Sequence, residues 1–164
     1  MNLTSLFSKI RRNDSLKTIA LPLVIGVLSG LLTMNSMEVF RTLQKPPLAP
    51  PALLFPIVWT LLYLLLGISF ALIKAANASG ELFSDAQSLY YYQLAANFLW
   101  PIFFFRYEWY LFSFFWLLFL WILVFAMIRT FIKIKPLAGY LNLPYLLWLT
   151  FAAYLNFGIW LLNR

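Results

Sequence analysis

The 164-residue sequence contains no cysteine and no histidine. Without cysteine the chain forms no disulfide and offers no thiolate to a metal ion, so the sequence leaves the redox state of its compartment undetermined. Without histidine it lacks the usual imidazole base, the usual zinc and haem ligand, and the usual activator of a serine nucleophile. We therefore expect no metal site, no catalytic triad and no bound cofactor. The chemistry has to come from aromatic rings, amides, a few charges and shape.

Charged residues are also scarce, at 10% of the chain, whereas 63% of the residues are hydrophobic and 20% are aromatic. No water-soluble domain of this length buries so much apolar surface, so the composition predicts an integral membrane protein in contact with lipid. The formal net charge is +7, but the cations cluster at the ends of apolar segments and form no basic face. This distribution argues against a nucleic-acid partner.

Five stretches are long enough to cross a bilayer, which takes about 20 apolar residues. Each should be a helix, because a backbone in lipid must satisfy its own hydrogen bonds and none of the stretches alternates as a barrel strand does. The predicted fold class is an all-α membrane protein, with one domain of five transmembrane helices over residues 1–164. The spans cover residues 18–37, 54–75, 88–105, 109–132 and 141–162, and a proline-rich loop covers residues 38–53.

The positions of the twelve Lys and Arg residues predict the orientation. The larger group lies before the first span and in the second and fourth connections, which share one side of the membrane. By the positive-inside rule the N-terminus is cytoplasmic, and the C-terminus and the proline-rich loop lie outside, in a bacterial-type plasma membrane. This group comprises Lys9, Arg11, Arg12, Lys17, Lys74, Arg129, Lys133 and Lys135.

Prolines crowd the segment that leads into the second span. Proline lacks a backbone donor and fixes its own φ, so Pro46, Pro47, Pro50 and Pro51 should hold the chain extended, while Pro56 is tolerated in the first turn of a helix. One interpretation is a stiff cover at the membrane interface. The alternative is a connector that only ends one helix and begins the next.

Three of the predicted helices carry aromatic and polar groups on one face. Amides within a bilayer are costly unless they are paired, so these faces should point into the bundle. Each face alone is typical of packing and interhelical hydrogen bonds, but three that converge beneath a rigid cover predict a pocket for a flat apolar ligand. The groups are Trp59 and Tyr63 in the second span, Gln93, Asn97 and Trp100 in the third, and Tyr145, Trp148, Ala152 and Asn156 in the fifth.

The first span contains two glycines, Gly26 and Gly30, in a small-xxx-small pattern that permits close contact between helices. The pattern is compatible with dimerisation, and equally with packing of the first helix inside its own bundle. In the fourth span, Trp116 and Trp121 are interpreted as lipid-facing or packing residues.

Three segments resemble the signature segments of the tryptophan-rich sensory protein, or translocator protein, family, whose eukaryotic members are also called peripheral-type benzodiazepine receptors. They are "KPPLAPPALLFPIVWTLLYLLLGIS" (45–69), "YYYQLAANFLWPIFF" (90–104) and "LPYLLWLTFAAYLNFGIW" (143–160). The resemblance extends from about residue 41 to the C-terminus, with the segments in the order and spacing of that family.

The resemblance implies a five-helix bundle that forms a homodimer and binds porphyrins and other lipophilic small molecules in a pocket under the first extramembrane loop. It implies that Pro47, Pro50 and Pro51 form the loop over that pocket. The ligand-binding residues that match the helix motifs are Trp59, Tyr63, Asn97, Trp100, Trp148, Ala152 and Asn156.

Three positions depart from the family pattern. Members commonly carry tryptophans in and just after the proline-rich loop, where this sequence has Leu48 and Leu53, and a methionine in the second helix, where it has Leu66. A tryptophan of this loop is implicated in porphyrin binding and photochemical breakdown among relatives, so the leucines weaken the case for catalytic breakdown.

The leading functional hypothesis is a membrane protein that binds tetrapyrroles or similar flat ligands in a sensory, regulatory or transport role. One alternative is an enzyme that degrades porphyrin with light and oxygen, although all five carboxylates lie outside the spans or at their ends and supply no acid or base within them. The other is a facilitator or channel for lipophilic molecules. The spans carry no central ionisable residue, which disfavours ion-coupled transport.

Overall fold

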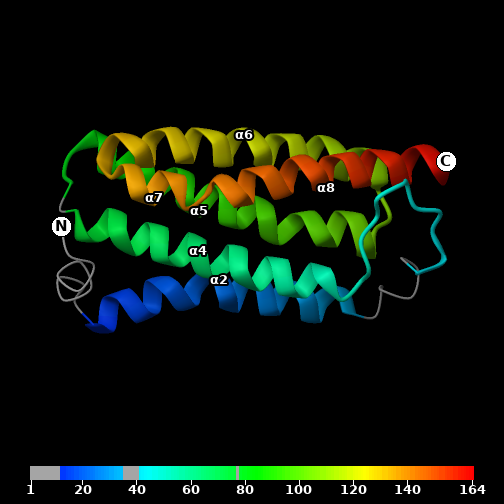
Figure 1. Ribbon diagram of the computed structural model, residues 1–164, viewed down its shortest axis with the longest axis horizontal. Coiled ribbons are helices and arrows are strands. Elements are labelled where there is room, and N and C mark those ends of the chain that lie inside the picture. The colour runs from blue at the N-terminus through cyan, green and yellow to red at the C-terminus, as the bar shows by residue number, and fades with distance from the viewer. Residues whose placement is uncertain (1–11, 35–40, 77) are drawn as a thin grey trace.

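The computed structural model describes residues 12–34, 41–76 and 78–164, and within these ranges the regular structure is helical. The predicted end of the first span at residue 37, the first residues of the proline-rich loop, and the cations Lys9 and Arg11 lie outside the described residues. The long helices run side by side along the long axis of the molecule (Figure 1). They are α2 (Arg12–Thr33), α4 (Leu54–Ala75), α5 (Glu81–Pro101), α6 (Tyr110–Ile134) and α8 (Leu143–Leu162).

Four segments of the described chain are long and apolar enough to cross a membrane, and α5 is not part of any of them. The helix begins at Glu81 rather than at residue 88, and its first turns carry Glu81, Asp85 and Gln87. Farther along, Gln93 and Asn97 lower its hydropathy again, but both side chains are buried inside the bundle. α5 thus falls short of the apolar segments because its first turns are polar and because it supplies two of the interior amides. The four segments are Ser15–Thr33, Leu54–Ala75, Tyr110–Ile134 and Pro136–Leu162.

α5 continues directly into the short π-helix η2 (Ile102–Arg106). Pro101 stands at the junction and has no backbone N–H, so it cannot bond to the carbonyl four residues earlier as a regular α-helix requires. The chain widens instead, and the N–H of Tyr107 bonds to the carbonyl oxygen of Ile102 at 3.1 Å. A tight turn then leads into α6, with Glu108 at a φ of 56°. Such wide turns often occur at functional sites.

Two glycines allow α2 to lie close against α4. A Cβ on Gly67 would stand 2.7 Å from the Cα of Ile19, and a Cβ on Gly26 would overlap the ring of Tyr63. By contrast, nothing lies within 4 Å of the place where a Cβ on Gly30 would sit. Of the two glycines of α2, Gly26 therefore allows a close contact with α4, and Gly30 lies beside open space.

The end of the bundle opposite the proline-rich loop is closed by a packed core. Phe70 of α4 stacks on Tyr90 of α5 with ring centroids 3.8 Å apart, and Phe131 of α6 lies against the other side of Phe70 at 6.1 Å. All three side chains are fully buried. The same end holds the short helix α7 (Pro136–Tyr140) and the turn into α8 (Figure 1).

The two tryptophans of α6 bind neighbouring helices. The indole N–H of Trp116 donates to the carbonyl oxygen of Ala96 at 2.8 Å, and that of Trp121 donates to the hydroxyl of Thr150 at 3.0 Å. Trp116 thereby joins α6 to α5, and Trp121 joins it to α8. Of the two interpretations made from the sequence, packing describes both residues.

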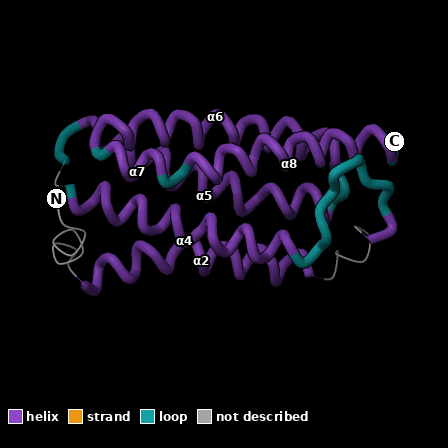
Figure 2. Tube along the Cα trace, viewed as in Figure 1, coloured by secondary structure: helices purple, strands orange, loops and turns teal. Residues whose placement is uncertain are grey.

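The proline-rich loop is described from residue 41 onward and is non-helical over residues 43–53 (Figure 2). It crosses the end of the bundle beside the C-terminus and is attached to α8. The ring of Pro46 fills the space above Gly158, and the hydroxyl of Tyr154 donates to the carbonyl oxygen of Pro47 at 2.8 Å. A turn from Pro46 to Ala49 follows, closed by a hydrogen bond of 3.3 Å. The prolines therefore form a cover that α8 holds in place.

Candidate functional site

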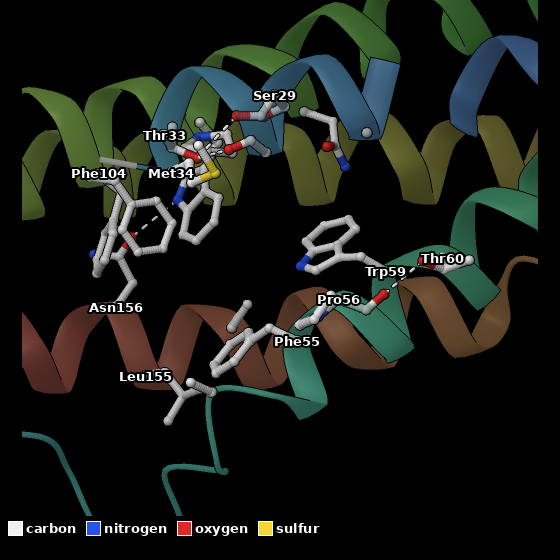
Figure 3. A pocket seen from close by; sticks show the side chains of 18 of the residues that line it. Ser29, Thr33, Met34, Phe55, Pro56, Trp59, Thr60, Phe104, Leu155 and Asn156 are labelled. Atoms are coloured by element: carbon white, nitrogen blue, oxygen red, sulfur yellow. Dashed lines mark hydrogen bonds between the residues drawn. The ribbon is translucent and has the colours of Figure 1, made fainter. Parts of the chain in front are cut away.

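A cavity of about 540 Å³ lies beneath the proline-rich loop, within the size range of small-molecule sites. Its walls come from α2, α4, α5, η2 and α8, and its cover is the loop. In Figure 3 the side chains of Thr33 at the end of α2, Met34 just after it, Trp59 from α4 and Phe104 from η2 border the same space. The aromatic lining residues are Phe55, Trp59, Tyr63, Trp100, Phe104 and Phe105, and the uncharged polar ones are Ser29, Thr33, Thr60, Asn97 and Asn156.

Most of the ligand-binding residues predicted from the sequence line this cavity. They come from the loop and from three helices that are far apart in the sequence, and the fold brings them to one space. Those that line it are Pro50, Trp59, Tyr63, Asn97, Trp100, Ala152 and Asn156.

Three predicted residues, Pro47, Pro51 and Trp148, do not line the cavity. Pro47 accepts the hydrogen bond from Tyr154 on the outer side of the loop. Pro51 is exposed, and its carbonyl oxygen accepts the N–H of Leu54 as α4 begins. Both prolines shape the cover without facing the space below it.

Trp148 lies behind the wall of the cavity. Its ring packs edge-on against Phe55 with centroids 5.9 Å apart, and Phe55 is the residue that faces the cavity. The indole N–H of Trp148 is buried and has no hydrogen-bond partner in the described part of the chain. The face predicted from Trp148 to Asn156 is therefore one turn longer than the part of α8 that lines the cavity.

The inner end of the cavity is built on a chain of side-chain hydrogen bonds that joins α4, α5 and α8. The hydroxyl of Tyr63 donates to Oδ1 of Asn97 at 2.6 Å, and Nδ2 of Asn97 donates to the hydroxyl of Tyr145 at 2.5 Å. Tyr145 donates in turn to Oε1 of Gln93 at 3.1 Å. Tyr63 and Asn97 line the cavity, while Tyr145 and Gln93 support them from behind.

A second polar cluster surrounds Asn156. Its Oδ1 accepts the indole N–H of Trp100 at 3.1 Å, and its Nδ2 donates to the carbonyl oxygen of Tyr110 at 2.7 Å. The hydroxyl of Ser113 lies 3.2 Å from the same Oδ1. Asn156 thus fixes the ring plane of Trp100, which is a wall of the cavity. The inward orientation predicted for Gln93, Asn97 and Asn156 is confirmed, with exposed fractions of 0%, 2% and 1%.

The first helix contributes a wall that the sequence analysis missed. Ser29 and Thr33 stand one turn apart on α2 and both line the cavity, together with Gly26 and Gly30. The signal was present as a run of small and hydroxyl residues on one helical face. The glycine pattern alone predicts a helix contact or a dimer contact, and it does not include Ser29 and Thr33. The lining also includes Phe104 and Phe105 of η2, and Leu155 and Ile159 of α8, which no motif singled out.

The positions that depart from the family pattern lie away from the cavity lining. Leu48 and Leu53 are 82% and 73% exposed, on the outer side of the loop and just before α4. Leu66 is buried in the core at 1%. None of the three leucines belongs to the cavity lining, so the walls of the cavity do not depend on these departures from the family pattern.

One charged side chain, Lys45, is contributed to the lining by the described residues. It lies in the proline-rich loop, at the mouth of the cavity. The remaining lining is apolar, aromatic or hydrogen-bonding without charge. This arrangement suits a ligand with a large apolar body and a polar or anionic edge near the cover.

The described part of the chain is a bundle of helices, and four of its segments are long and apolar enough to cross a bilayer. A ligand-sized cavity lies under the proline-rich loop at one end. These features define a helical integral membrane protein. The chain belongs to the TspO/MBR family, whose model matches residues 18–161. Both the all-α membrane fold and the family resemblance predicted from the sequence are thereby confirmed.

Curated relatives include bacterial and animal proteins. The chain is 36% identical to "Protein CrtK" of Rhodobacter capsulatus over 124 residues, which cover 76% of this chain and 78% of the relative. It is 32% identical to "Tryptophan-rich protein TspO" of Chlorobaculum tepidum over 146 residues, covering 88% and 92%. It is 33% identical to "Translocator protein" of Ovis aries over 126 residues, covering 76% and 75%.

Proposed function

We propose that the chain binds a flat, largely apolar small molecule in the cavity beneath the proline-rich loop, with porphyrin as the leading candidate, and that binding serves a sensory, regulatory or transport role in tetrapyrrole metabolism. The observation that carries the proposal is the convergence of Trp59, Tyr63, Asn97, Trp100 and Asn156 on one cavity of about 540 Å³. The names of two relatives, a tryptophan-rich sensory protein and a translocator protein, fit a sensory or transport role.

The chemistry of the walls supports this ligand class. Trp59 of α4 and Trp100 of α5 both line the cavity, and aromatic rings prefer to stack on or meet the edge of another flat π-system. A second polar group of the ligand, on the edge away from the cover, meets Asn97 and Tyr63 at the inner end. At the mouth, the ammonium group of Lys45 suits a carboxylate.

Titration of the protein in lipid nanodiscs with protoporphyrin tests the proposal. The absorption spectrum of the porphyrin reports binding and stays usable when a tryptophan is removed. Trp59→Leu removes a ring from the cavity and should weaken binding by roughly fivefold to tenfold. Trp121→Phe, which changes a tryptophan outside the cavity, is the matched control and should bind as the wild type does. Equal affinity of all three proteins would place the ligand elsewhere.

Photo-oxidative breakdown of porphyrin is a second candidate, because two indoles, Trp59 and Trp100, line the cavity and are oxidisable. Illumination of the porphyrin complex in air separates the two functions. A new product that forms over several turnovers supports the enzyme, whereas saturable binding without bleaching supports a binding protein.

A channel for lipophilic molecules is less well supported. Beyond Tyr63 the interior is filled by Leu66, Phe70 and Tyr90, whose side chains are at most 1% exposed. The cavity therefore ends against a packed core. Uptake of porphyrin into protein-containing liposomes would support the channel.

We further propose that the N-terminus is cytoplasmic, in a bacterial-type plasma membrane. Lys17 and Lys74 belong to the end of the bundle where α2 starts and α4 ends, and Lys133 and Lys135 to the same end where α6 stops. This is the end opposite the proline-rich loop (Figure 1). A homodimer is part of the same proposal, and its contact would not use Gly26, because the ring of Tyr63 occupies the space beside that glycine.

A further inference from the structure

The hydrogen bonds at the inner end of the cavity all run in one direction. Tyr63 donates to Asn97, Asn97 to Tyr145, Tyr145 to Gln93, and Nε2 of Gln93 to the carbonyl oxygen of Tyr90 at 3.1 Å. Each group therefore donates a hydrogen to the next group in the series, which leads away from the cavity.

This direction is fixed by the last member of the chain. A main-chain carbonyl can only accept, so Gln93 must turn its NH₂ group to Tyr90 and its Oε1 to Tyr145. The hydroxyl of Tyr145 then has to donate to that oxygen, and it accepts from Nδ2 of Asn97. Asn97 consequently presents Oδ1 to Tyr63, whose single hydroxyl hydrogen is consumed in that bond.

We infer that the inner end of the cavity is a hydrogen-bond acceptor and selects flat apolar ligands that carry an N–H or O–H donor on their leading edge. The acceptor is the remaining lone-pair capacity of the Tyr63 hydroxyl. A ligand with an ether or carbonyl oxygen at the same place would face an oxygen with no hydrogen to give, and neither group would be satisfied. This inference rests on the proposed binding function and specifies the ligand class of that site.

The position of Tyr63 makes it the group that a ligand meets. It lies nine residues after the start of α4, roughly 13 Å along the helix from the covered end. Asn97 retains one amide hydrogen beyond its bond to Tyr145, but the residue as a whole is more deeply buried than Tyr63, at 2% against 7% exposed. Both residues line the cavity, and the inference assigns the contact with the ligand to the hydroxyl of Tyr63.

Three tricyclic compounds of nearly the same shape test the inference. Carbazole has an N–H in its central ring, dibenzofuran has an oxygen there, and fluorene has a CH₂. Equilibrium dialysis against nanodiscs with and without protein gives the affinity of each, corrected for its partition into lipid. We expect the wild type to bind carbazole roughly tenfold more tightly than dibenzofuran, since only carbazole satisfies the hydroxyl.

Tyr63→Phe removes the acceptor and should bring the ratio of the two affinities to about one, with little change for fluorene. Tyr92→Phe is the matched control, because Tyr92 is an exposed tyrosine outside the cavity lining. It should keep the preference of the wild type. Circular dichroism and size-exclusion chromatography establish that each variant is folded.

Gln93→Met distinguishes the proposed selectivity from a purely structural role of these hydrogen bonds. The substitution removes the acceptor of Tyr145, so Tyr145 can donate to Oδ1 of a rotated Asn97, and Nδ2 of Asn97 then donates to Tyr63. The hydroxyl hydrogen of Tyr63 is released toward the cavity. The preference should then invert, with dibenzofuran bound several-fold more tightly than carbazole.

The outcomes separate the inference from the function on which it rests. If protoporphyrin and the three tricyclic compounds bind but the wild type does not prefer carbazole, or if Tyr63→Phe keeps the preference, the inference is wrong and the binding function stands. An unchanged preference in folded Gln93→Met also overturns it. If neither protoporphyrin nor any tricyclic compound binds, both the inference and the proposed function fail.

Discussion

The side-chain amide of Asn163 forms two hydrogen bonds with the main chain of Gln44, which lies 119 residues earlier. The N–H of Gln44 donates to Oδ1 of Asn163, and Nδ2 of Asn163 donates to the carbonyl oxygen of Gln44, both at 2.9 Å. The amide thereby pairs with the backbone as a neighbouring strand would. The entry to the proline-rich loop is thus fixed to the end of α8, and the cover of the cavity depends on a residue far from it in sequence.

Asn163→Leu should loosen this cover. The substitution removes both bonds, and a net contribution of about 1 kcal/mol for each bond corresponds to roughly a thirtyfold change in an equilibrium. We expect bound porphyrin to dissociate up to about thirtyfold faster, as measured by stopped-flow transfer to empty nanodiscs. Asn163→Asp keeps the acceptor and loses the donor, so its rate should be intermediate. Dissociation at the wild-type rate in both variants would show that the pairing does not hold the cover.

The two glycines of α2 should respond differently to alanine. A Cβ on Gly26 overlaps the ring of Tyr63, which Asn97 holds in place, whereas a Cβ on Gly30 meets nothing within 4 Å. Gly26→Ala should destabilise the fold by about 1–3 kcal/mol through overpacking. Gly30→Ala should be neutral or stabilising by up to about 1 kcal/mol, because alanine favours the helix. Unfolding in mixed detergent micelles measures both, and equal effects would contradict the assigned faces.

Filling the cavity from α2 should abolish binding without unfolding the protein. Gly30 lines the cavity and has open space where its Cβ would lie, so the ring of Gly30→Phe should occupy the ligand's place. We expect porphyrin affinity to fall by more than about tenfold, because the ring and the ligand exclude each other. The helical content should remain that of the wild type. Gly30→Ala is the size control and should retain binding, and porphyrin affinity unaffected by phenylalanine would place the ligand outside this cavity.

Leu48 offers a site for stabilisation. It follows Pro47 in the turn from Pro46 to Ala49 and has a φ of 67°, a left-handed conformation that costs a side-chain-bearing residue free energy and costs glycine none. Since the side chain is 82% exposed, Leu48→Gly loses little packing. The free energy of unfolding should rise by roughly 0.5–1 kcal/mol, seen as a higher thermal midpoint.

Leu53→Gly is the matched control for that experiment. Leu53 is similarly exposed, but its φ of −64° is an ordinary helical value, so glycine brings no relief there and only adds freedom to the unfolded chain. Its thermal midpoint should stay the same or fall. A gain at both positions would mean that loss of exposed leucine, and not the backbone conformation, causes the effect.

Composition and local pattern were sufficient to predict the class of fold and the inward orientation of the buried amides. Composition placed the chain in a membrane, and the cost of an unpaired amide in lipid required Gln93, Asn97 and Asn156 to face inward. The prolines excluded helix from the loop, because a missing N–H and a fixed φ act locally. Each of these arguments depends on one residue or one helical face, so it needs no knowledge of neighbours.

The packing of the helices sets which faces meet and where the cavity ends. Trp148 shares a helical face with Ala152 and Asn156, but Phe55 of α4 lies in front of it. Gly30 became part of a cavity wall and Gly26 a contact for Tyr63, although the two share one motif. The direction of the hydrogen bonds from Tyr63 to Gln93 likewise depends on three helices in register. Such outcomes follow from the relative shift of packed helices, which is set by all their side chains together and is therefore absent from the local pattern of any one of them.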